Sequence, residues 1–467
     1  MWGWPAPLPD APGAPVAVEA PPWPDRSGTP ELAERWHAGE VSTLGELIDV
    51  ALSRNPETRI AYLQVRGAAA DLAASRAAYV PTLELDGVLS TGRQAAQSGA
   101  TSVRQTVYGP SLTLNYLLFD FGGRGGRNDE AYEALAAAAL SHNAAILDVV
   151  LQVQQAYYGL QTAKAAAAAA EATLKETAQG LSAAEGRRDS GVATLAEVLQ
   201  ARTARSQALL ELQRLQGQEQ GLVGVLATVL GLPANTLIDV GSLPESLPVV
   251  EAAGKVESSI EQALAARPDL AAARAQALRA QAHIGTVRSG AFPTLGLVGN
   301  ASRQYYQPHP YELYSDNWSV QLALRIPLFD GLASVFAARR AAADAEVAVA
   351  RADSIEQQVI LQVWLSFHDL ETALLRLTTA RDLLLSAEQS ERVALGRYQE
   401  GAGSILDLLT AQAALANARA QEIMARSDWL LAVAQLAHST GSLEPQAPRA
   451  AAYSTLRKED DAVSAQP

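Results

Sequence analysis

The sequence contains no cysteine among its 467 residues, so neither disulfide bonds nor thiolate metal sites can form. Charged residues make up only 18% of the chain, and their balance gives a formal net charge of −14. Nucleic-acid binding needs clustered Lys and Arg to neutralise phosphates, and the sequence shows no such clustering. We therefore expect no nucleic-acid partner.

Long hydrophobic runs are also absent. No unbroken apolar run approaches the roughly 20 residues that a membrane-spanning helix needs. Hydrophobic residues nevertheless make up 48% of the chain, which is enough to bury a large core and excludes general disorder. If the chain crosses a membrane, it does so as strands.

Catalytic and metal-binding patterns are lacking as well. The histidines show no paired helical spacing of the kind that binds a metal, and no Ser-His-Asp arrangement is recognisable. They are His37, His142, His283, His309, His368 and His438. The glycine-rich segment 122–126 lacks the Lys-Ser/Thr of a phosphate loop, so a strand-to-helix turn is the better interpretation. We expect no enzyme, no metal and no cofactor.

The segment 318–330 reads as a strand with two different faces. Trp318, Val320 and Leu322 alternate with Ser319 and Gln321, so one face suits lipid and the other water. A half-buried strand of a soluble sandwich would show the same pattern, but the pattern recurs at 110–120. Both copies end in Leu-Phe-Asp followed by a nearby glycine.

The chain is a tandem duplication. Pro293-Thr294-Leu295 repeats Pro81-Thr82-Leu83 after 212 residues, and Gly401 repeats Gly191 after 210 residues. In each copy the first strand and the second are predicted to form a β-hairpin, with a polar loop at 92–106 in the first copy.

Long helical hairpins follow each β-hairpin. The stretch 126–232 is rich in alanine and free of proline, and its apolar residues step by three and four as in a coiled coil. The seam residues are Ile146, Val150, Val153, Tyr157 and Leu160, and in the second copy Ile360, Val363, Phe367, Leu370, Leu374 and Leu377. A helix of about 60 residues reaches roughly 90 Å, far beyond a globular domain.

The expected organisation has five parts. They are an extended Pro-rich segment at 1–41, a first repeat at 42–241, a linker at 242–256, a second repeat at 257–441 and a flexible tail at 442–467. The β-hairpins are expected at about 82–120 and 294–329, and the long helical hairpins at about 124–231 and 332–440. Glycine can end a helix at positive φ, which places the hairpin turns at Gly191 and Gly401.

These features together resemble the TolC-like outer-membrane factors, the outer membrane efflux protein family. The resemblance covers residues 41–441. It is carried by the segment 44–57 (LGELIDVALSRNPE), the two Pro-Thr-Leu strand starts, the two Leu-Phe-Asp strand ends and the tip segments 190–201 and 400–411.

The resemblance implies a mainly α fold with a transmembrane β-barrel. Each protomer would give four strands and its long coiled-coil hairpins, and a homotrimer would form a 12-stranded barrel and an α-helical periplasmic tunnel. Elementary physics agrees, because four strands cannot close a barrel and open edges are prohibitive in lipid. The implied function is a passive exit duct of a tripartite efflux or type I secretion system in the outer membrane of a Gram-negative bacterium. Its partners would be lipid, a periplasmic adaptor and an inner-membrane pump of RND or ABC type.

The resemblance also implies three sites. The periplasmic aperture is matched by Leu406, Asp407 and Thr410, and a closed-state latch by Tyr398 and Glu197. Thr410 stands where some relatives have a second acid, and Gly403 replaces a basic latch partner of some relatives. The adaptor docking tips are Gly191, Val192, Ala193, Thr194, Gly401, Ala402, Gly403 and Ser404.

Simpler interpretations stay open at this point. Asp407 could be a solvated charge on an outer helix face, and the tip residues could serve only the helix turn. For the whole chain, the alternative is a soluble coiled-coil scaffold protein, for which the long helices alone would suffice. The alternating strands favour the channel, because a scaffold needs no lipid-facing surface.

Overall fold

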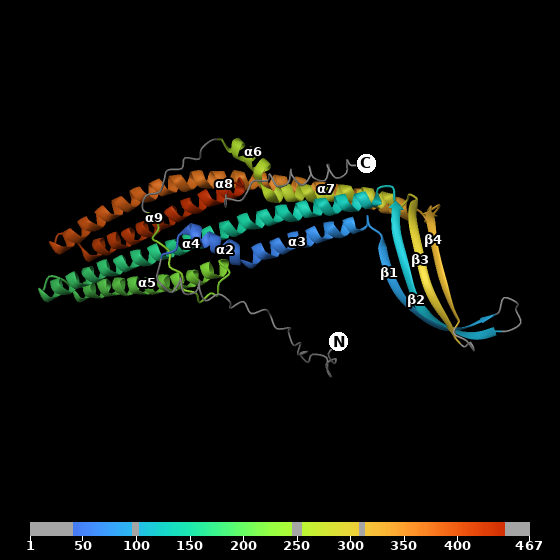
Figure 1. Ribbon diagram of the computed structural model, residues 1–467. Coiled ribbons are helices and arrows are strands. Elements are labelled where there is room, and N and C mark those ends of the chain that lie inside the picture. Colours follow the sequence, from blue (N-terminus) through green and yellow to red (C-terminus); the bar gives the residue numbers. More distant parts are fainter. Residues whose placement is uncertain (1–40, 96–101, 245–254, 308–312, 444–467) are drawn as a thin grey trace.

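The molecule is an elongated bundle of long helices with a four-stranded sheet at one end, where the strands turn away from the helix axes (Figure 1). This computed structural model describes residues 41–95, 102–244, 255–307 and 313–443. The predicted extended segment, apart from its last residue, nearly all of the predicted tail and residues 245–254 of the predicted linker lie outside the described residues.

The two repeats form the same series of elements. The first contains α2 (Leu44–Arg54), α3 (Pro56–Ala77), β1 (Thr82–Ala95), β2 (Ser102–Phe119), α4 (Gly123–Asp189) and α5 (Leu195–Val229). The second contains α6 (Val256–Ala266), α7 (Pro268–Ser289), β3 (Thr294–Gln307), β4 (Leu313–Arg325), α8 (Ala333–Gln399) and α9 (Ile405–Ser439). The first long helix of each repeat has 67 residues, which corresponds to roughly 100 Å.

The hairpin turns follow from local capping chemistry. Gly191 and Gly401 have φ of 76° and 80°, a left-handed conformation that favours glycine. Thr194 then caps α5 and forms a capping box with Glu197. Ser404 caps α9 in the same way. The predicted turn positions are confirmed, and both turns lie at the end of the molecule opposite the sheet (Figure 1).

The sheet is antiparallel with the order β1-β2-β3-β4. Its strands run further than the sequence indicated, because Gly92 pairs with Gln105 and Arg93 pairs with Arg104. The prediction of a polar loop over 92–106 is therefore wrong for most of that segment. Ladder hydrogen bonds join backbone groups, so polar side chains on both faces do not end a strand.

The helical core lies along the predicted seams. Val153 and Leu160 of α4 are at most 1% exposed, and Val363 of α8 is fully buried. α4 contacts its hairpin partner α5 on one side and α9 of the other repeat on the opposite side, while α8 contacts α9. The four helices of the two helical hairpins therefore lie side by side in the order α5, α4, α9, α8 (Figure 1).

One helix among the described residues, α4, is long and apolar enough to cross a membrane by length and composition alone. One stretch of 18 residues in α4 has a mean hydropathy of 1.6. Polar residues interrupt the stretch, so a search for an unbroken apolar run does not find it. Alanine raises the hydropathy of this helix, and α4 packs against α3, α5, α7 and α9. Even so, only 17% of that stretch is buried within the described chain.

Candidate channel wall and hairpin tips

One face of the sheet is apolar in all four strands. The register places Leu85 beside Leu112, Leu112 beside Ala301, and Ala301 beside Trp318. Trp318 is 80% exposed, although burial of an aromatic side chain is strongly favourable in water. The opposite face is polar, and Asn300 there donates to Ser111 Oγ at 3.2 Å. An apolar band on one side and a polar surface on the other are typical of a barrel wall in lipid.

The sheet has two open edges. β1 and β4 each pair with one neighbour only, so their outer backbone groups have no ladder partner within the described chain. Exposed edges cannot persist in hydrocarbon, where no water can satisfy the backbone. A sheet with these two open edges suits a segment of a larger closed barrel.

A buried arginine joins the first β-hairpin to its long helix. Arg124 is 8% exposed and lies at the start of α4, where its guanidinium donates to the carbonyls of Leu117 at 2.7 Å and Leu118 at 2.9 Å. It also pairs with Asp120 at 3.6 Å and lies over the Tyr79 ring. The glycine-rich segment is thus the predicted strand-to-helix turn, and Arg124 fixes the angle between strand and helix.

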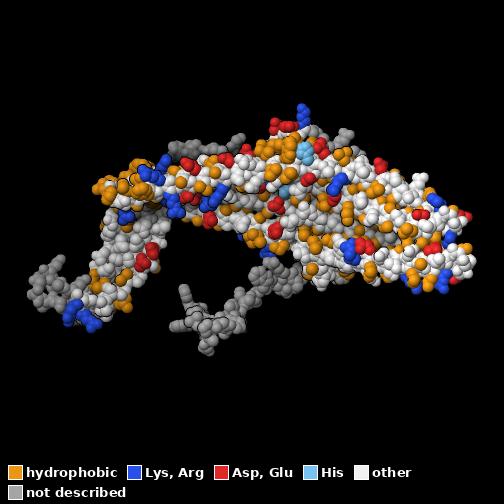
Figure 2. Space-filling view, turned by 180° about the vertical axis from the view of Figure 1, so that it is seen from behind, with side chains coloured by type: hydrophobic (Ala, Val, Ile, Leu, Met, Phe, Trp, Pro, Cys, Tyr) orange, Lys and Arg blue, Asp and Glu red, His pale blue; other side chains and the backbone are white. Residues whose placement is uncertain are grey.

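The second repeat leaves the equivalent junction uncovered. Ser334 stands where the first repeat has Arg124, and its backbone N–H donates to Asp330 at 2.8 Å. Leu328 and Phe329 beside it are 91% and 81% exposed. Figure 2 shows hydrophobic side chains gathered where the strands meet the helices. An apolar surface at this end of α8 is typical of a contact with another chain.

The tip residues form a small-residue surface at the far end of both hairpins. Val192 is 66% exposed, Ala402 is exposed and Ala193 is half-buried. Gly403 differs from them, because a Cβ there would lie 3.2 Å from Arg397 Cβ and from the Tyr398 backbone nitrogen. The tight contact is one local reason for glycine here, although Ala193 occupies the same position in the first repeat, so the identity of Gly403 says nothing by itself about a partner.

The two predicted latch residues lie near each other without a hydrogen bond between them. Tyr398 is fully buried, and its hydroxyl has no partner among the described residues. Burial raises the pKa of Tyr398, and the charge of Glu197 raises that pKa further. The Glu197 carboxylate accepts from the Thr194 backbone N–H at 3.2 Å. Within one protomer, the hydrogen bond of the Glu197 carboxylate is therefore made to the N-cap of α5 and not to Tyr398.

Arg187 is the residue that the sequence analysis missed at the tips. Its guanidinium lies 4.8 Å from the Tyr398 ring centre, and Nη1 donates to the Tyr398 carbonyl at 2.6 Å. It thereby joins the end of α4 to the end of α8. Arg187 therefore places a basic side chain against Tyr398, a contact between distant helices that the sequence alone did not indicate.

The three residues predicted to line the aperture lie at the start of α9. Leu406 is 65% exposed, and Asp407 and Thr410 are exposed as well. The Asp407 carboxylate accepts from the Ser404 backbone N–H at 3.3 Å, which fixes its position at the helix N-terminus. The negative charge stays free to face solvent or a neighbouring chain.

A polar layer links the two helical hairpins above the tips. Arg419 of α9 donates to both oxygens of Glu176 of α4, at 3.0 and 2.8 Å. Glu391 of α8 is 6% exposed beside this pair, and burial first, then the charge of Glu176, raises its pKa. Buried charges need paired partners, so this layer fixes the register of the hairpins.

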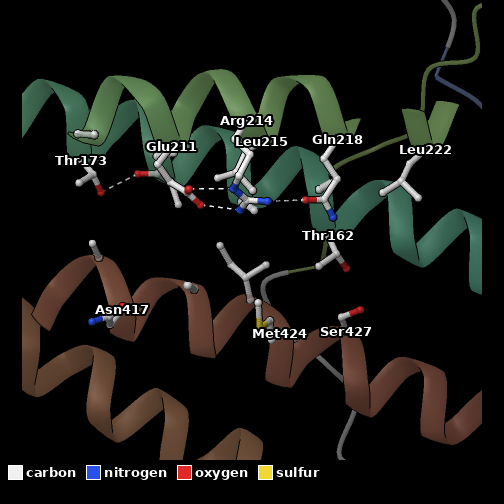
Figure 3. A pocket seen from close by; sticks show the side chains of 18 of the residues that line it. Thr162, Thr173, Glu211, Arg214, Leu215, Gln218, Leu222, Asn417, Met424 and Ser427 are labelled. Atoms are coloured by element: carbon white, nitrogen blue, oxygen red, sulfur yellow. Dashed lines mark hydrogen bonds and ion pairs between the residues drawn. The ribbon is translucent and has the colours of Figure 1, made fainter. Parts of the chain in front are cut away.

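A groove of about 600 Å³ runs between α5 and α9, with α4 as its floor (Figure 3). Glu211 on one wall accepts from Arg214 at 2.6 Å, and Arg214 also donates to Gln218 at 3.2 Å. The rest of its lining is mainly small and apolar, with alanine the commonest residue. The lining contains no histidine and a single carboxylate that is already paired, so the groove offers no acid–base pair for catalysis.

A sheet with one lipid-suited face and open edges, fused to roughly 100 Å helical struts, is typical of a membrane-anchored duct. The family model described as outer membrane efflux protein matches residues 47–232 and 259–442. The chain belongs to this family. The two matched ranges correspond to the two repeats of the fold.

Relatives of known name support this assignment. Protein CyaE of Bordetella pertussis is 28% identical over 384 residues, which cover 81% of this chain and 80% of CyaE. Outer membrane protein OprJ of Pseudomonas aeruginosa is 28% identical over 430 residues, covering 87% and 86%. Among solved structures, VceC of Vibrio cholerae superposes with a TM-score of 0.75 at 24% identity, covering 85% of this chain and 96% of that chain.

These findings confirm the predicted family, the mainly helical fold with four strands, the efflux or secretion function and the outer-membrane location. They set aside the soluble scaffold. The family and its relatives are channel and transport proteins. The trimer, the aperture, the latch and the docking tips stay predictions.

Proposed function

We propose that the chain is the passive exit duct of a tripartite efflux or type I secretion system and that it works as a homotrimer without catalysis of its own. The observation that carries this proposal is the four-stranded sheet with an apolar face and two open edges. A periplasmic adaptor and an inner-membrane pump, of RND or ABC type, would supply cargo and energy. Three chains would give twelve strands and one tunnel through the outer membrane and periplasm.

The internal repeat supports the trimer and specifies its contacts. Within one chain, α4 contacts both α5 and α9. By the repeat, α8 corresponds to α4, so α8 should contact α9 and also α5 of the next protomer. Within the chain, α7 also contacts α4. By the repeat, α3 of the next protomer should therefore contact α8 and cover its exposed apolar junction. The helices would then follow one another around the tunnel without a gap.

The trimer predicts one particular strand pairing. Leu112 of β2 pairs with Ala301 of β3. Applying the repeat offsets, Leu322 of β4 should pair with Leu89 of β1 in the next protomer. Both leucines belong to the apolar face, and a slip of one residue would turn one of them toward the lumen.

We expect the variant carrying Leu89→Cys and Leu322→Cys to form covalent dimers and trimers on oxidation, because directly opposite Cβ atoms lie about 5 Å apart. The natural chain has no cysteine, so the background is clean. Non-reducing gel electrophoresis of the detergent-solubilised protein measures the products. Val88→Cys with Leu322→Cys is the matched control and should cross-link poorly, since Val88 faces the other side. If the oxidised variant ran only as monomers on the gel, the trimer would be contradicted.

At the inner end of the tunnel, we propose that Leu406, Asp407 and Thr410 line the periplasmic aperture. Three symmetric copies would place three carboxylates around a narrow opening and attract cations, because low-dielectric walls focus the field. The exposed, capping position of Asp407 supports this proposal. Beside it, Tyr398, Glu197 and Arg187 would hold the duct shut.

The latch predicts that Arg187→Ala opens the channel. The change removes a cation–π contact and a charge-assisted hydrogen bond, so the open-state population should rise about tenfold or more. Single-channel recording in planar bilayers measures it. Arg188→Ala is the matched control, because Arg188 is exposed at the next position. Equal open probability in the two variants would show that Arg187 does not hold the channel shut.

A further inference from the structure

The apolar face of the sheet changes its character toward the end that lies away from the helices. Beyond the Trp318 row, the register places Arg303 beside Asp316, and the next row joins Tyr108, Tyr305 and Tyr314. Tyr108 and Tyr305 stack at 5.3 Å. Aromatic girdles of this kind mark the boundary between hydrocarbon and headgroups in membrane barrels.

Two arginines lie beyond this girdle on the same face. Arg93 is four residues further along β1 than Leu89, which belongs to the tyrosine row, and it pairs directly with Arg104 of β2. Four residues advance a strand by about 14 Å, or about 10 Å along the membrane normal at the usual tilt. This height corresponds to the headgroup layer. Figure 2 shows Lys and Arg side chains gathered at this end of the sheet.

The pairing of these two arginines is unfavourable by itself. Like charges directly opposite each other destabilise an antiparallel pair. Arg303 has its carboxylate, since it donates to Asp316 at 2.6 and 2.9 Å. Arg93 and Arg104 are both exposed and have no acidic partner among the described residues. The two arginines therefore lack a neutralising anion, and they lie at the height of the lipid phosphates.

We propose that Arg93 and Arg104 bind the phosphate of a lipid in the outer leaflet. This proposal rests on the proposed barrel and adds a specific lipid contact to it. Guanidinium groups match phosphate oxygens in bidentate geometry, and two opposed groups can share one phosphate. The continuity of the site with the apolar band favours a lipid, because acyl chains can pack below while the phosphate is held above.

The test titrates the full-length protein in detergent with bis-phosphorylated lipid A, phosphatidylcholine or inorganic phosphate and measures apparent Kd by native mass spectrometry. The natural chain should bind lipid A at least about tenfold more tightly than phosphatidylcholine. Arg93→Gln with Arg104→Gln should weaken lipid A binding about 30-fold, near fivefold for each arginine, and leave phosphatidylcholine unchanged. Arg93→Lys with Arg104→Lys keeps both charges and should retain most of the binding.

Arg66→Gln with Arg205→Gln is the matched control, because it removes two exposed arginines from α3 and α5. It should leave lipid A binding unchanged. Unaltered lipid A affinity in the Arg93 and Arg104 glutamine variant would overturn the proposal. Displacement of lipid A by millimolar inorganic phosphate would identify a free-phosphate site and overturn the lipid assignment. Bilayer conductance of the same samples tests the duct separately, since a conducting channel without the lipid preference sinks only this inference.

Discussion

Arg124→Ala should destabilise the protein by about 3 kcal/mol, one of the two largest effects that we expect from a single substitution. The change removes the donor from the Leu117 and Leu118 carbonyls and leaves Asp120 with weaker compensation. Unsatisfied buried groups and unpaired buried charges are among the costliest defects in a folded chain. Urea unfolding in detergent, followed by tryptophan fluorescence, measures the free-energy change.

Arg127→Ala provides the matched control for this position. Arg127 also lies 3.5 Å from Asp120, but its side chain is 47% exposed. A solvent-exposed pair contributes little, so the control should cost less than about 1 kcal/mol. Arg124→Met with Asp120→Asn removes both charges while keeping bulk, and it should recover part of the loss. Equal destabilisation by Arg124→Ala and Arg127→Ala would show that burial of Arg124 does not matter.

The elements that sequence predicted well are those with long periodic signals. The seam through Val153 and Val363 specified two long coiled-coil hairpins, and Gly191 with Gly401 located their turns. Each signal repeats after about 210 residues, so each prediction was supported by two separate segments of the same chain. Strand alternation at Trp318 likewise identified the apolar face before any register was known.

The contacts that sequence could not predict depend on how distant segments meet. Arg124 looked like part of a glycine-rich turn, and only the packed junction shows its carbonyl partners. Arg187 carries no pattern that links it to Tyr398, which lies 211 residues away. The extension of the strands through Gly92 was missed because ladder hydrogen bonding leaves no trace in side-chain polarity.

The hairpin tips should be the positions most sensitive to added bulk. We expect Ala193→Trp and Ala402→Trp each to reduce export at least about 100-fold while the trimer remains. A tryptophan side chain holds a partner helix away from a small-residue surface, and overpacking of this kind costs up to about 3 kcal/mol. Gly403→Trp is a poorer choice, because even a Cβ there would lie in tight contact, at 3.2 Å, with Arg397 and the turn backbone.

Export of pump cargo from cells expressing each variant measures this effect, together with recovery of the adaptor after chemical cross-linking. Ala193→Ser and Ala402→Ser are the matched controls, since serine adds polarity at nearly unchanged size and should leave export intact. The Leu89→Cys and Leu322→Cys cross-link, introduced into each tryptophan variant, reports whether the trimer persists. A loss of export with an intact trimer and a lost adaptor contact assigns the tips to docking. Normal export from both tryptophan variants would show that these residues form the helix turn and do not contact an adaptor.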